Sequence, residues 1–340
     1  MKDPFAKAEV RIAVIGGGTG SFTMLSAFKR HTTQIAAIVS MADDGGSTGV
    51  LRDELGTLPP GDVRKCLVAL SDSPKVRDLF DYRFEEGTFA GHAFGNLLLT
   101  ALEKLTGDFS EAVETASEIL RINGTVIPAT LDDVRLKMSW EGASVELHTE
   151  RVIDAEYFKK DPRKATLSLV PSATANPMAI SAIEQADIVV IAPGDLYTSL
   201  GPLLVIDGVG EALRTTDALC IYVSNLVSKA GQTDDFTVSD HAKEIERFAG
   251  APFLDYVIYN NAEPSPALAE RYAEEGGVVT KVDHDQLESA AYTAVGAPLL
   301  GKMATSNQAD VIAATRSLIR HDGARVARVI MDIYEKEHSS

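Results

Sequence analysis

Short runs rich in Val and Ile, separated by longer amphipathic stretches, recur along this chain of 340 residues. Several of the runs are followed by Gly, Pro or Asn, which end strands, and the stretches between them have the apolar spacing of helices. Repetition of strand, crossover helix and strand is the signature of a parallel sheet covered on both faces. The pattern therefore predicts an α/β fold. The predicted strands are Arg11–Ile15, Gln34–Val39, Asp187–Ala192, Ala218–Val223, Tyr256–Tyr259 and Val278–Val282.

The stretches between the strands give the predicted helices, and one region breaks the alternation. From about residue 125 to 170, alternating runs such as Val134–Met138, Ser144–Leu147 and Ala165–Leu169 indicate extra strands with little helix. We interpret the chain, 1–340, as one domain with a small β-rich insertion at about 125–170 on one sheet edge, closed by helices from Ala309 onward. The predicted helices are Phe22–Arg30, Asp62–Ser71, Asn96–Leu105, Ser110–Leu120, Pro177–Gln185, Leu203–Arg214, Ser239–Phe248 and Pro266–Glu275.

Composition narrows the classes of protein to consider. The chain is 45% hydrophobic and 24% charged, as in globular proteins with a sizeable core, and its net charge is −17. This charge, without a basic stripe, argues against nucleic acid or anionic membranes as partners. No signal core and no run of about 18 apolar residues occurs, so we expect a cytoplasmic protein with no membrane span. Cys66 and Cys220 are expected to be buried thiols in a reducing compartment.

The first predicted strand leads into a glycine-rich loop, Gly16-Gly17-Gly18-Thr19-Gly20-Ser21, followed by a helix. Glycines allow a tight turn, and the free N–H groups at a helix start form an anion site. The dinucleotide fingerprint is incomplete, because its third glycine falls on Ser21, and no Walker A lysine is present. The alternative is a turn whose glycines only permit close packing.

An acidic motif follows the second strand, at the edge where open α/β sheets bind ligands. Asp43 and Asp44 precede a glycine pair, and Asp62 follows Pro59-Pro60-Gly61. Carboxylates on neighbouring loops suit Mg²⁺ held together with a phosphate, to which Arg52 and Arg64 would add bidentate contacts. The alternatives are solvated turn residues at 43 and 44 and a helix cap at Asp62.

Three further loops carry polar side chains. His92 could be a general acid or base, a phosphate donor or a loop histidine bonded to backbone. Asn96 is expected at the start of a helix, where its side chain could also face a ligand. The loop Pro193-Gly194-Asp195-Leu196-Tyr197-Thr198-Ser199 offers hydroxyls and a ring, or helix caps. Ser224-Asn225 and Gly231-Gln232-Thr233 follow the next strand.

Two other sites are disfavoured by the sequence. No Cys/His pairing has zinc spacing. The letters Gly45-Gly46-Ser47-Thr48-Gly49 match a nucleophile elbow, but an acidic loop precedes them and no clear helix starts after Ser47, so a flexible glycine turn is expected.

The segments GGGTG, ADDGGSTGVLRDELGTLPPGDVRKCLVAL, GHAFGNLLL and PGDLYTS together closely resemble the YvcK family of gluconeogenesis factors, within the superfamily that includes the phospholactate transferase CofD. The resemblance runs from about Arg11 to Ile333 and includes Arg320-His321-Asp322. It implies a Rossmann-like fold, a cytoplasmic location, a homodimer, and a role in carbon metabolism, cell-wall synthesis and cell shape with binding of a UDP-sugar such as UDP-N-acetylglucosamine. Five positions depart from the family pattern: Thr149, Ala192, Asp195, Leu203 and Gln232. A carboxylate at 195 would repel a phosphate unless it is protonated or metal-bound.

Two hypotheses follow. The first is a regulatory protein that binds a nucleotide-sugar without turnover. For it the sequence indicates no cofactor firmly, although Mg²⁺ is possible. The second is a CofD-like transferase of a phosphorus-containing group, in which Asp43, Asp44 and Asp62 hold Mg²⁺ and Asp44, Asp62, Arg64 and His92 are the catalytic candidates. An NAD-dependent dehydrogenase fits poorly. The predicted ligand-binding residues are Gly16, Gly17, Gly18, Thr19, Gly20, Asp43, Asp44, Arg64, Asn96, Pro193, Gly194, Tyr197, Thr198, Asn225 and Arg320.

Overall fold

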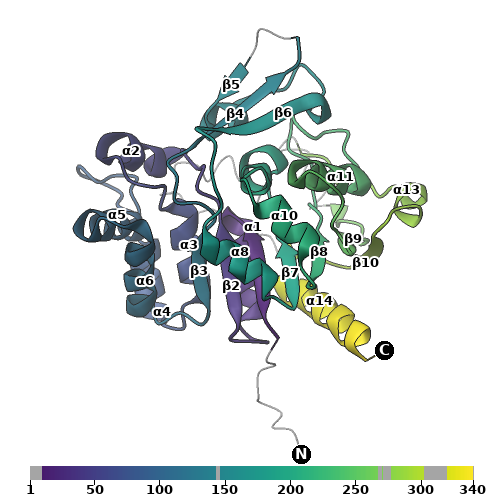
Figure 1. Ribbon diagram of the computed structural model, residues 1–340, viewed down its shortest axis with the longest axis horizontal. Helices are drawn as coiled ribbons and strands as arrows, with labels where there is room; N and C mark the ends of the chain where they lie inside the picture. The colour runs from purple at the N-terminus through teal and green to yellow at the C-terminus, as the bar shows by residue number, and fades with distance from the viewer. Residues whose placement is uncertain (1–9, 143–145, 267–269, 271–276, 302–319, 340) are drawn as a thin grey trace, which may run out of the picture.

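A seven-stranded sheet, parallel throughout, forms the centre of the computed structural model, which describes residues 10–142, 146–266, 270, 277–301 and 320–339 (Figure 1). The order is β10-β9-β8-β7-β1-β2-β3, so the chain starts at the middle and extends first to one side and then to the other. The direction of winding reverses between β1 and β7. The strands are β1 (Ile12–Gly16), β2 (Ile35–Val39), β3 (Thr125–Pro128), β7 (Ile188–Ile191), β8 (Leu219–Val223), β9 (Tyr256–Asn260) and β10 (Thr293–Ala297).

Helices cover both faces of this sheet, as the sequence predicts. Alternate residues of β1 enter different apolar cores: Ala13 and Ile15 face one, Ile12 and Val14 the other. The second core includes α1 (Gly18–Phe28), α3 (Gly61–Leu70), α6 (Phe109–Leu120) and α14 (Gly323–His338). The first core includes α8 (Pro177–Glu184), α9 (Gly201–Leu204), α10 (Val209–Thr215) and α11 (Val238–Ala249).

Shorter elements complete the described chain. After β2, and then between α3 and α6, come α2 (Gly46–Leu55), α4 (Pro74–Asp81) and α5 (Phe94–Thr106). A one-turn π-helix, η2 (Leu196–Leu200), follows β7, and α13 (His284–Glu288) precedes β10. π-Helical turns are rare and are frequent at functional sites.

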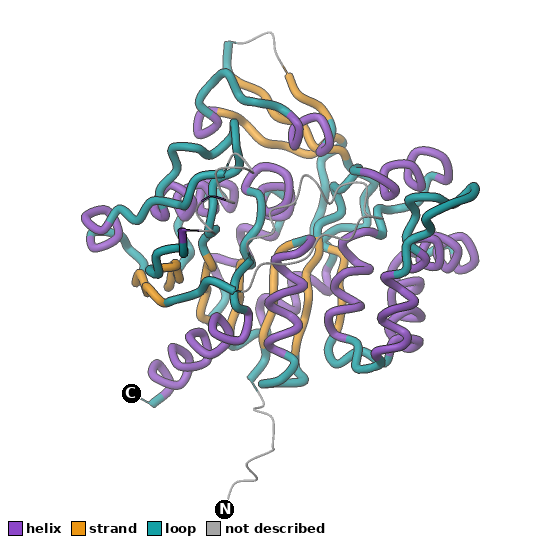
Figure 2. The backbone as a smooth tube through the Cα atoms, turned by 180° about the vertical axis from the view of Figure 1, so that it is seen from behind, coloured by secondary structure: helices purple, strands orange, loops and turns teal. Residues whose placement is uncertain are grey.

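A second sheet, antiparallel and three-stranded, forms a lobe over the carboxyl ends of the main strands (Figure 2). We use "the lobe" for residues 135–170. Its order is β5-β4-β6, and Met138 and Trp140 of the central strand point into the first core. The lobe contains β4 (Arg135–Trp140), β5 (Glu146–His148), α7 (Glu150–Ala155), η1 (Pro162–Lys164) and β6 (Ala165–Val170).

The structure corrects several boundaries. Residues 278–282 form only isolated bridges, through Val279 and Lys281, and the seventh strand is instead β10. β3 belongs to the main sheet and not to the insertion. The predicted helix from Leu203 to Arg214 is interrupted at residues 205–208: α9 ends at Leu204, and α10 begins after its N-cap Gly208, whose φ is 95°.

Two more expectations concern helices. The expected flexible turn around Ser47 is the start of α2, which begins at Gly46. The predicted helix Pro266–Glu275 and the start of the closing helices at Ala309 fall largely outside the described residues, and α14 is the described part of that closing segment.

Candidate ligand-binding site

The predicted loops meet at the carboxyl edge of the sheet, beneath the lobe (Figure 1). The glycine loop follows β1 and the loop Pro193–Ser199 follows β7, so the two flank the point where the winding reverses. Open α/β sheets bind ligands at such a switch point.

The glycine loop opens α1, which has Gly17 at its N-cap and no side-chain capping bond. A Cβ at Gly20 would lie 1.7 Å from the carbonyl oxygen of Pro193, so glycine there lets α1 approach the β7 loop. This is the close-packing role that the sequence left open. It does not account for Gly17 and Gly18, which face ionised side chains of α3.

Asp62 and Lys65 lie over the head of α1. A Cβ at Gly17 would be 2.3 Å from Oδ2 of Asp62, and one at Gly18 would be 3.6 Å from Nζ of Lys65. The two side chains form an ion pair with Nζ and Oδ1 3.2 Å apart. The glycine loop therefore faces a carboxylate and a lysine, and not solvent alone.

Asp43 and Asp44 lie beside this pair but have different partners. Asp44 is buried, accepts the backbone N–H of Arg151 at 2.8 Å and pairs with Arg135 of the lobe at 3.3 Å. Asp43 accepts the N–H of Gly45 at 2.9 Å. Burial, reinforced by the charge of Asp62, raises the pKa of Asp43 to about 6. Asp44 thus joins the lobe to the loop after β2, whereas Asp43 lies close to other carboxylates.

Glu150, at the start of α7, brings a further carboxylate to this place. A Cβ at Gly45 would lie 3.3 Å from Oδ1 of Asp43 and 3.5 Å from Oε2 of Glu150, so the two acids flank one glycine. Burial, followed by the charge of Asp43, raises the pKa of Glu150 to about 9. Glu150 is therefore protonated at neutral pH in this arrangement.

Carboxylate oxygens are the ligands that Mg²⁺ prefers. Among the described residues, however, no three acidic, histidine or cysteine side chains converge closely enough to hold a metal ion. Asp44 and Asp62 each pair with a cation, Arg135 and Lys65. The observed arrangement does not fit the ion, and magnesium binding by Asp43, Asp44 and Asp62 stays a prediction.

Both arginines of the acidic motif, Arg52 and Arg64, form hydrogen bonds to other residues of the protein. The side chain of Arg52, 1% exposed, donates to Asp133 and to the carbonyl of Val134. Arg64 is also buried and donates to Asp81 and, at 2.9 Å, to Oδ1 of Asn96. Arg52 therefore joins α2 to the segment just before the lobe and is not available to phosphate. Ligand contacts by Arg64 and Asn96 would require these bonds to be exchanged.

His92 lies in the turn between α4 and α5. Its carbonyl accepts from Phe84, and its Nδ1 is buried without a hydrogen-bond partner within the described ranges. This geometry does not test a role of His92 as a general acid or base, and that role stays a prediction.

The loop after β7 contributes side chains of two kinds. Tyr197 is 1% exposed, donates to Glu244 of α11 at 2.9 Å, and packs edge-on against Phe158 and Phe248. Thr198 donates to Asp154 of α7 at 3.4 Å. In this state both residues hold the lobe against the main domain, and a ligand-binding role for either stays a prediction.

Asp195, expected to repel phosphate, has a counterion that sequence did not identify. Nζ of Lys229 lies 3.1 Å from Asp195 and 2.5 Å from Asp154. Burial would lower the pKa of Lys229, but the charges of Asp195 and Asp154 outweigh it and hold the pKa above its usual range. The carboxylate of Asp195 is thus part of a triad in which Lys229 pairs with both Asp154 and Asp195.

Two amide side chains fix neighbouring loops. Asn225 donates to the carbonyl of Gly194 at 2.8 Å and accepts its N–H at 3.0 Å, so the β7 and β8 loops are locked together. The amide nitrogen of Gln232 donates to the carbonyl of Ile153 at 2.7 Å and more weakly to Asp154 and Glu156, at the end of α7. Arg320, through its carbonyl, accepts the N–H of Gly301 at 2.8 Å.

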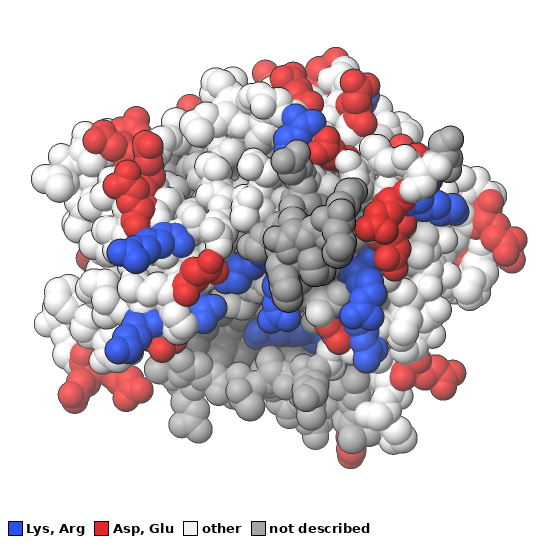
Figure 3. Space-filling view, turned by 90° about the horizontal axis from the view of Figure 1, so that it is seen from below, with Lys and Arg blue, Asp and Glu red and all other residues white. Residues whose placement is uncertain are grey.

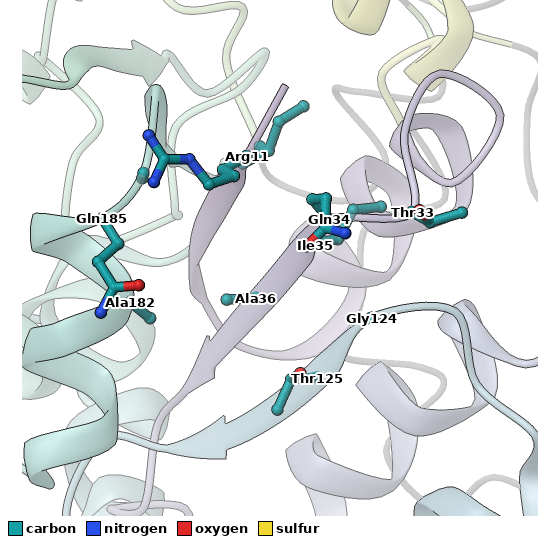
Figure 4. A pocket seen from close by; sticks show the side chains of 11 residues that line it. Arg11, Thr33, Gln34, Ile35, Ala36, Gly124, Thr125, Ala182 and Gln185 are labelled. Atoms are coloured by element: carbon teal, nitrogen blue, oxygen red, sulfur yellow. The ribbon is translucent and has the colours of Figure 1, made fainter. Parts of the chain in front are cut away.

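A pocket of about 160 Å³ lies elsewhere, at the opposite edge of the sheet, between the first residues of β1, β2 and β3 and the carboxyl end of α8 (Figure 4). Its lining is mostly small or uncharged, and Arg11 there is paired with Asp187 at 2.7 Å. The face seen from this side shows basic side chains gathered around its middle and acidic side chains mostly toward its rim (Figure 3). None of the predicted ligand-binding residues lines this pocket.

Sequence reasoning missed four ionisable residues of the site: Lys65, Arg135, Glu150 and Lys229. Lys65 could have been found, because it lies three positions after Asp62 on a predicted helix and so shares its face. The other three depend on how the lobe folds back over the sheet, which no local pattern indicates.

Fold and site together define a doubly wound α/β protein with a glycine loop and a charged, lobe-covered carboxyl edge. A family model described as 2-phospho-L-lactate transferase CofD matches residues 12–300. The gluconeogenesis factor of Bacillus subtilis is 35% identical over 96% of this chain and 98% of its own, and that of Halalkalibacterium halodurans is 35% identical over 97% and 98%. A crystal structure of a UPF0052-family protein from Bacillus halodurans superposes with a TM-score of 0.85 at 32% identity, over 96% of this chain and 100% of that one.

The chain therefore belongs to the CofD family, and these relatives within it are gluconeogenesis factors. The family and the Rossmann-like fold expected from the motifs are confirmed. None of the helices in the described part of the chain is long and apolar enough to cross a membrane.

Proposed function

We propose that this protein binds a nucleotide-sugar of the UDP-N-acetylglucosamine type at the carboxyl edge and acts as a regulator without turnover. The observation that carries the proposal is the head of α1, which lacks a side-chain cap and opens at the switch point of the sheet. Uncapped N–H groups and the helix dipole favour a diphosphate there. The proposal includes a cytoplasmic homodimer linked to carbon metabolism, cell-wall synthesis and cell shape.

The internal hydrogen bonds of three other polar residues support a regulatory role for the site. Arg52, Arg64 and Tyr197 are buried and hydrogen-bonded within the protein, so they brace the loops around α1. A regulator needs such a rigid site and has no need of a positioned nucleophile or base.

Thermal-shift titration with UDP-N-acetylglucosamine, UDP and uridine tests the proposal. A ligand that binds only the native state raises its stability by about 2.7 kcal/mol at a hundredfold excess over Kd. We expect a clear rise in the melting temperature with the two diphosphates and little with uridine. No rise with any of the three would contradict the proposal.

The second candidate is a CofD-like transferase of a phosphorus-containing group, and the family match over residues 12–300 favours it. It requires a divalent ion among Asp43, Asp44 and Asp62, which these residues do not accommodate as they lie. A nucleotide-induced shift that needs Mg²⁺ and is lost in Asp62→Asn would favour the transferase over the regulator.

A further inference from the structure

The ion pair over the glycine loop occupies the place where a phosphate would lie. Oδ2 of Asp62 is 2.3 Å from the position of a Cβ on Gly17, and Oδ1 is 3.7 Å from that on Gly18. Nζ of Lys65 is 3.6 Å from the same point on Gly18. In the free protein, the carboxylate of Asp62 therefore lies against the glycines at the head of α1.

A buried hydroxyl marks the same loop as incomplete. Ser21, 1% exposed, lies in the first turns of α1, and its Oγ has no hydrogen-bond partner among the described residues. A Cβ on Gly16 would be 2.7 Å from this Oγ, so the hydroxyl points back into the glycine loop. Buried polar groups without a partner are uncommon and require explanation. A ligand oxygen in the loop would supply the missing partner.

The electrostatics around Asp62 make its present position replaceable. Among the described contacts, the carboxylate of Asp62 has one cation, Lys65. The side chains of Asp62 and Lys65 are 13% and 18% exposed, so neither is sealed in the core. An incoming phosphate would repel Asp62 and attract Lys65.

We propose that Lys65 is the cation that binds the ligand's phosphate, exchanging the carboxylate of Asp62 for it. The free protein holds the Asp62–Lys65 pair over Gly17 and Gly18, and the bound protein holds a phosphate there, with Asp62 displaced. The inference rests on the proposed function and adds a selectivity rule. The site takes ligands with a charged phosphate or diphosphate and rejects the uncharged nucleoside, because only a charged group compensates Lys65 for the lost carboxylate.

The test measures binding of inorganic pyrophosphate by calorimetry, in buffer with EDTA so that no divalent ion contributes. The variants are Lys65→Gln, Asp62→Asn and, as a matched control, Lys75→Gln on an exposed position of α4. A bond to a charged partner contributes enough that Lys65→Gln should weaken binding by roughly tenfold or more. Asp62→Asn, which removes the competing charge, should tighten it several-fold, and Lys75→Gln should leave it unchanged. Circular dichroism and melting curves confirm that each variant is folded.

The outcomes separate this inference from the proposed function. Equal binding of pyrophosphate by wild type and Lys65→Gln, or no binding by any form, overturns the role of Lys65. If UDP-N-acetylglucosamine still binds wild type in that case, the proposed function stands. Pyrophosphate binding that depends on Lys65, without any binding of UDP-sugars, leaves the inference standing and removes the nucleotide-sugar.

Discussion

The lobe side and the sheet side of the site differ in how far their charged and polar groups are paired within the protein. On the lobe side, formed by the end of α7 and the residues that contact it, Lys229 pairs with Asp154, and the amide of Gln232 donates to carbonyls at the end of the helix. The sheet side is formed by the glycine loop, the acidic motif and Glu150 at the start of α7. There, burial and then the charge of Asp43 raise the pKa of Glu150, and the buried Oγ of Ser21 has no hydrogen-bond partner among the described residues. The groups at the end of α7 are therefore paired within the protein, whereas the sheet side has a buried hydroxyl without a partner and crowded carboxylates, whose environment a ligand can change.

This difference separates braces from binding residues. Buried polar groups with full sets of partners contribute mainly to stability, because removing one partner leaves the other desolvated and unpaired. Groups held in partial or repulsive contacts are the ones whose environment binding can improve. Substitutions on the lobe side should therefore change stability first, and those on the sheet side should change pH dependence and binding.

The largest expected effect is that of Gln232→Glu. Gln232 is 5% exposed and its amide donates to carbonyls at the end of α7, so a glutamate would place a buried charge against carbonyl oxygens. We expect a loss of about 3–5 kcal/mol in the free energy of unfolding, measured by urea denaturation. The same exchange at the exposed Gln185 is the control. Equal effects at the two positions would show that Gln232 does not hold the lobe.

A smaller effect, with the opposite sign, is expected for Glu150→Gln. The pKa of Glu150 is raised from 4.5 to about 9, so the folded protein keeps a proton that the unfolded chain releases. Wild-type stability therefore falls as pH rises through that window. The variant escapes this loss, and at pH 8 it should be more stable by on the order of 2 kcal/mol.

Melting curves between pH 4 and pH 9 check this prediction. The two proteins should coincide near pH 4 and separate as pH rises, while Glu141→Gln, at an exposed position of the lobe, should follow wild type throughout. If the melting temperatures of Glu150→Gln and wild type change with pH in the same way, the pKa of Glu150 is not raised in the folded protein.

Lys229→Met should cost less, about 1 kcal/mol, because the lysine side chain is 24% exposed and water screens the two aspartates once it is gone. Adding Asp195→Asn should restore part of the loss, since it removes one of the unpaired charges. A double-mutant cycle by chemical denaturation measures this coupling. Strict additivity would argue against the triad.

The smallest effect is expected far from the site. Arg11 pairs with Asp187 at 2.7 Å at the amino edge, but its side chain is 53% exposed. Exposed pairs of this kind contribute little, so Arg11→Gln should leave both the melting temperature and ligand binding unchanged. A marked loss of ligand binding would move attention to the pocket beside Arg11.

Local patterns were enough to predict most of the sheet but not the lobe's position. Strands such as Ile188–Ile191 are continuous β-branched runs, which local sequence identifies. β10 was missed because Thr293–Ala297 includes two alanines and a glycine and is a strand through its pairing with β9. α2 was missed because Gly46 and Gly49 favour a turn, although close contact at residue 44 requires glycine at 49.

The site was predictable where its residues lie close in sequence. The glycine loop and the acidic motif are local and were identified, but their partners were not. Whether Arg64 faces a ligand or Asn96 depends on α3 packing against α5, and whether Asp195 meets a cation depends on Lys229 in another loop. Such pairings arise from tertiary contacts, and a single sequence does not record them.

The most direct test of the account is a crystal structure of the protein grown with UDP-N-acetylglucosamine. The account predicts diphosphate oxygens within hydrogen-bonding distance of the backbone N–H groups that begin α1 and of Nζ of Lys65, with Asp62 turned away from Gly17. A nucleotide-sugar bound elsewhere, with the Asp62–Lys65 pair intact over the glycine loop, would contradict it.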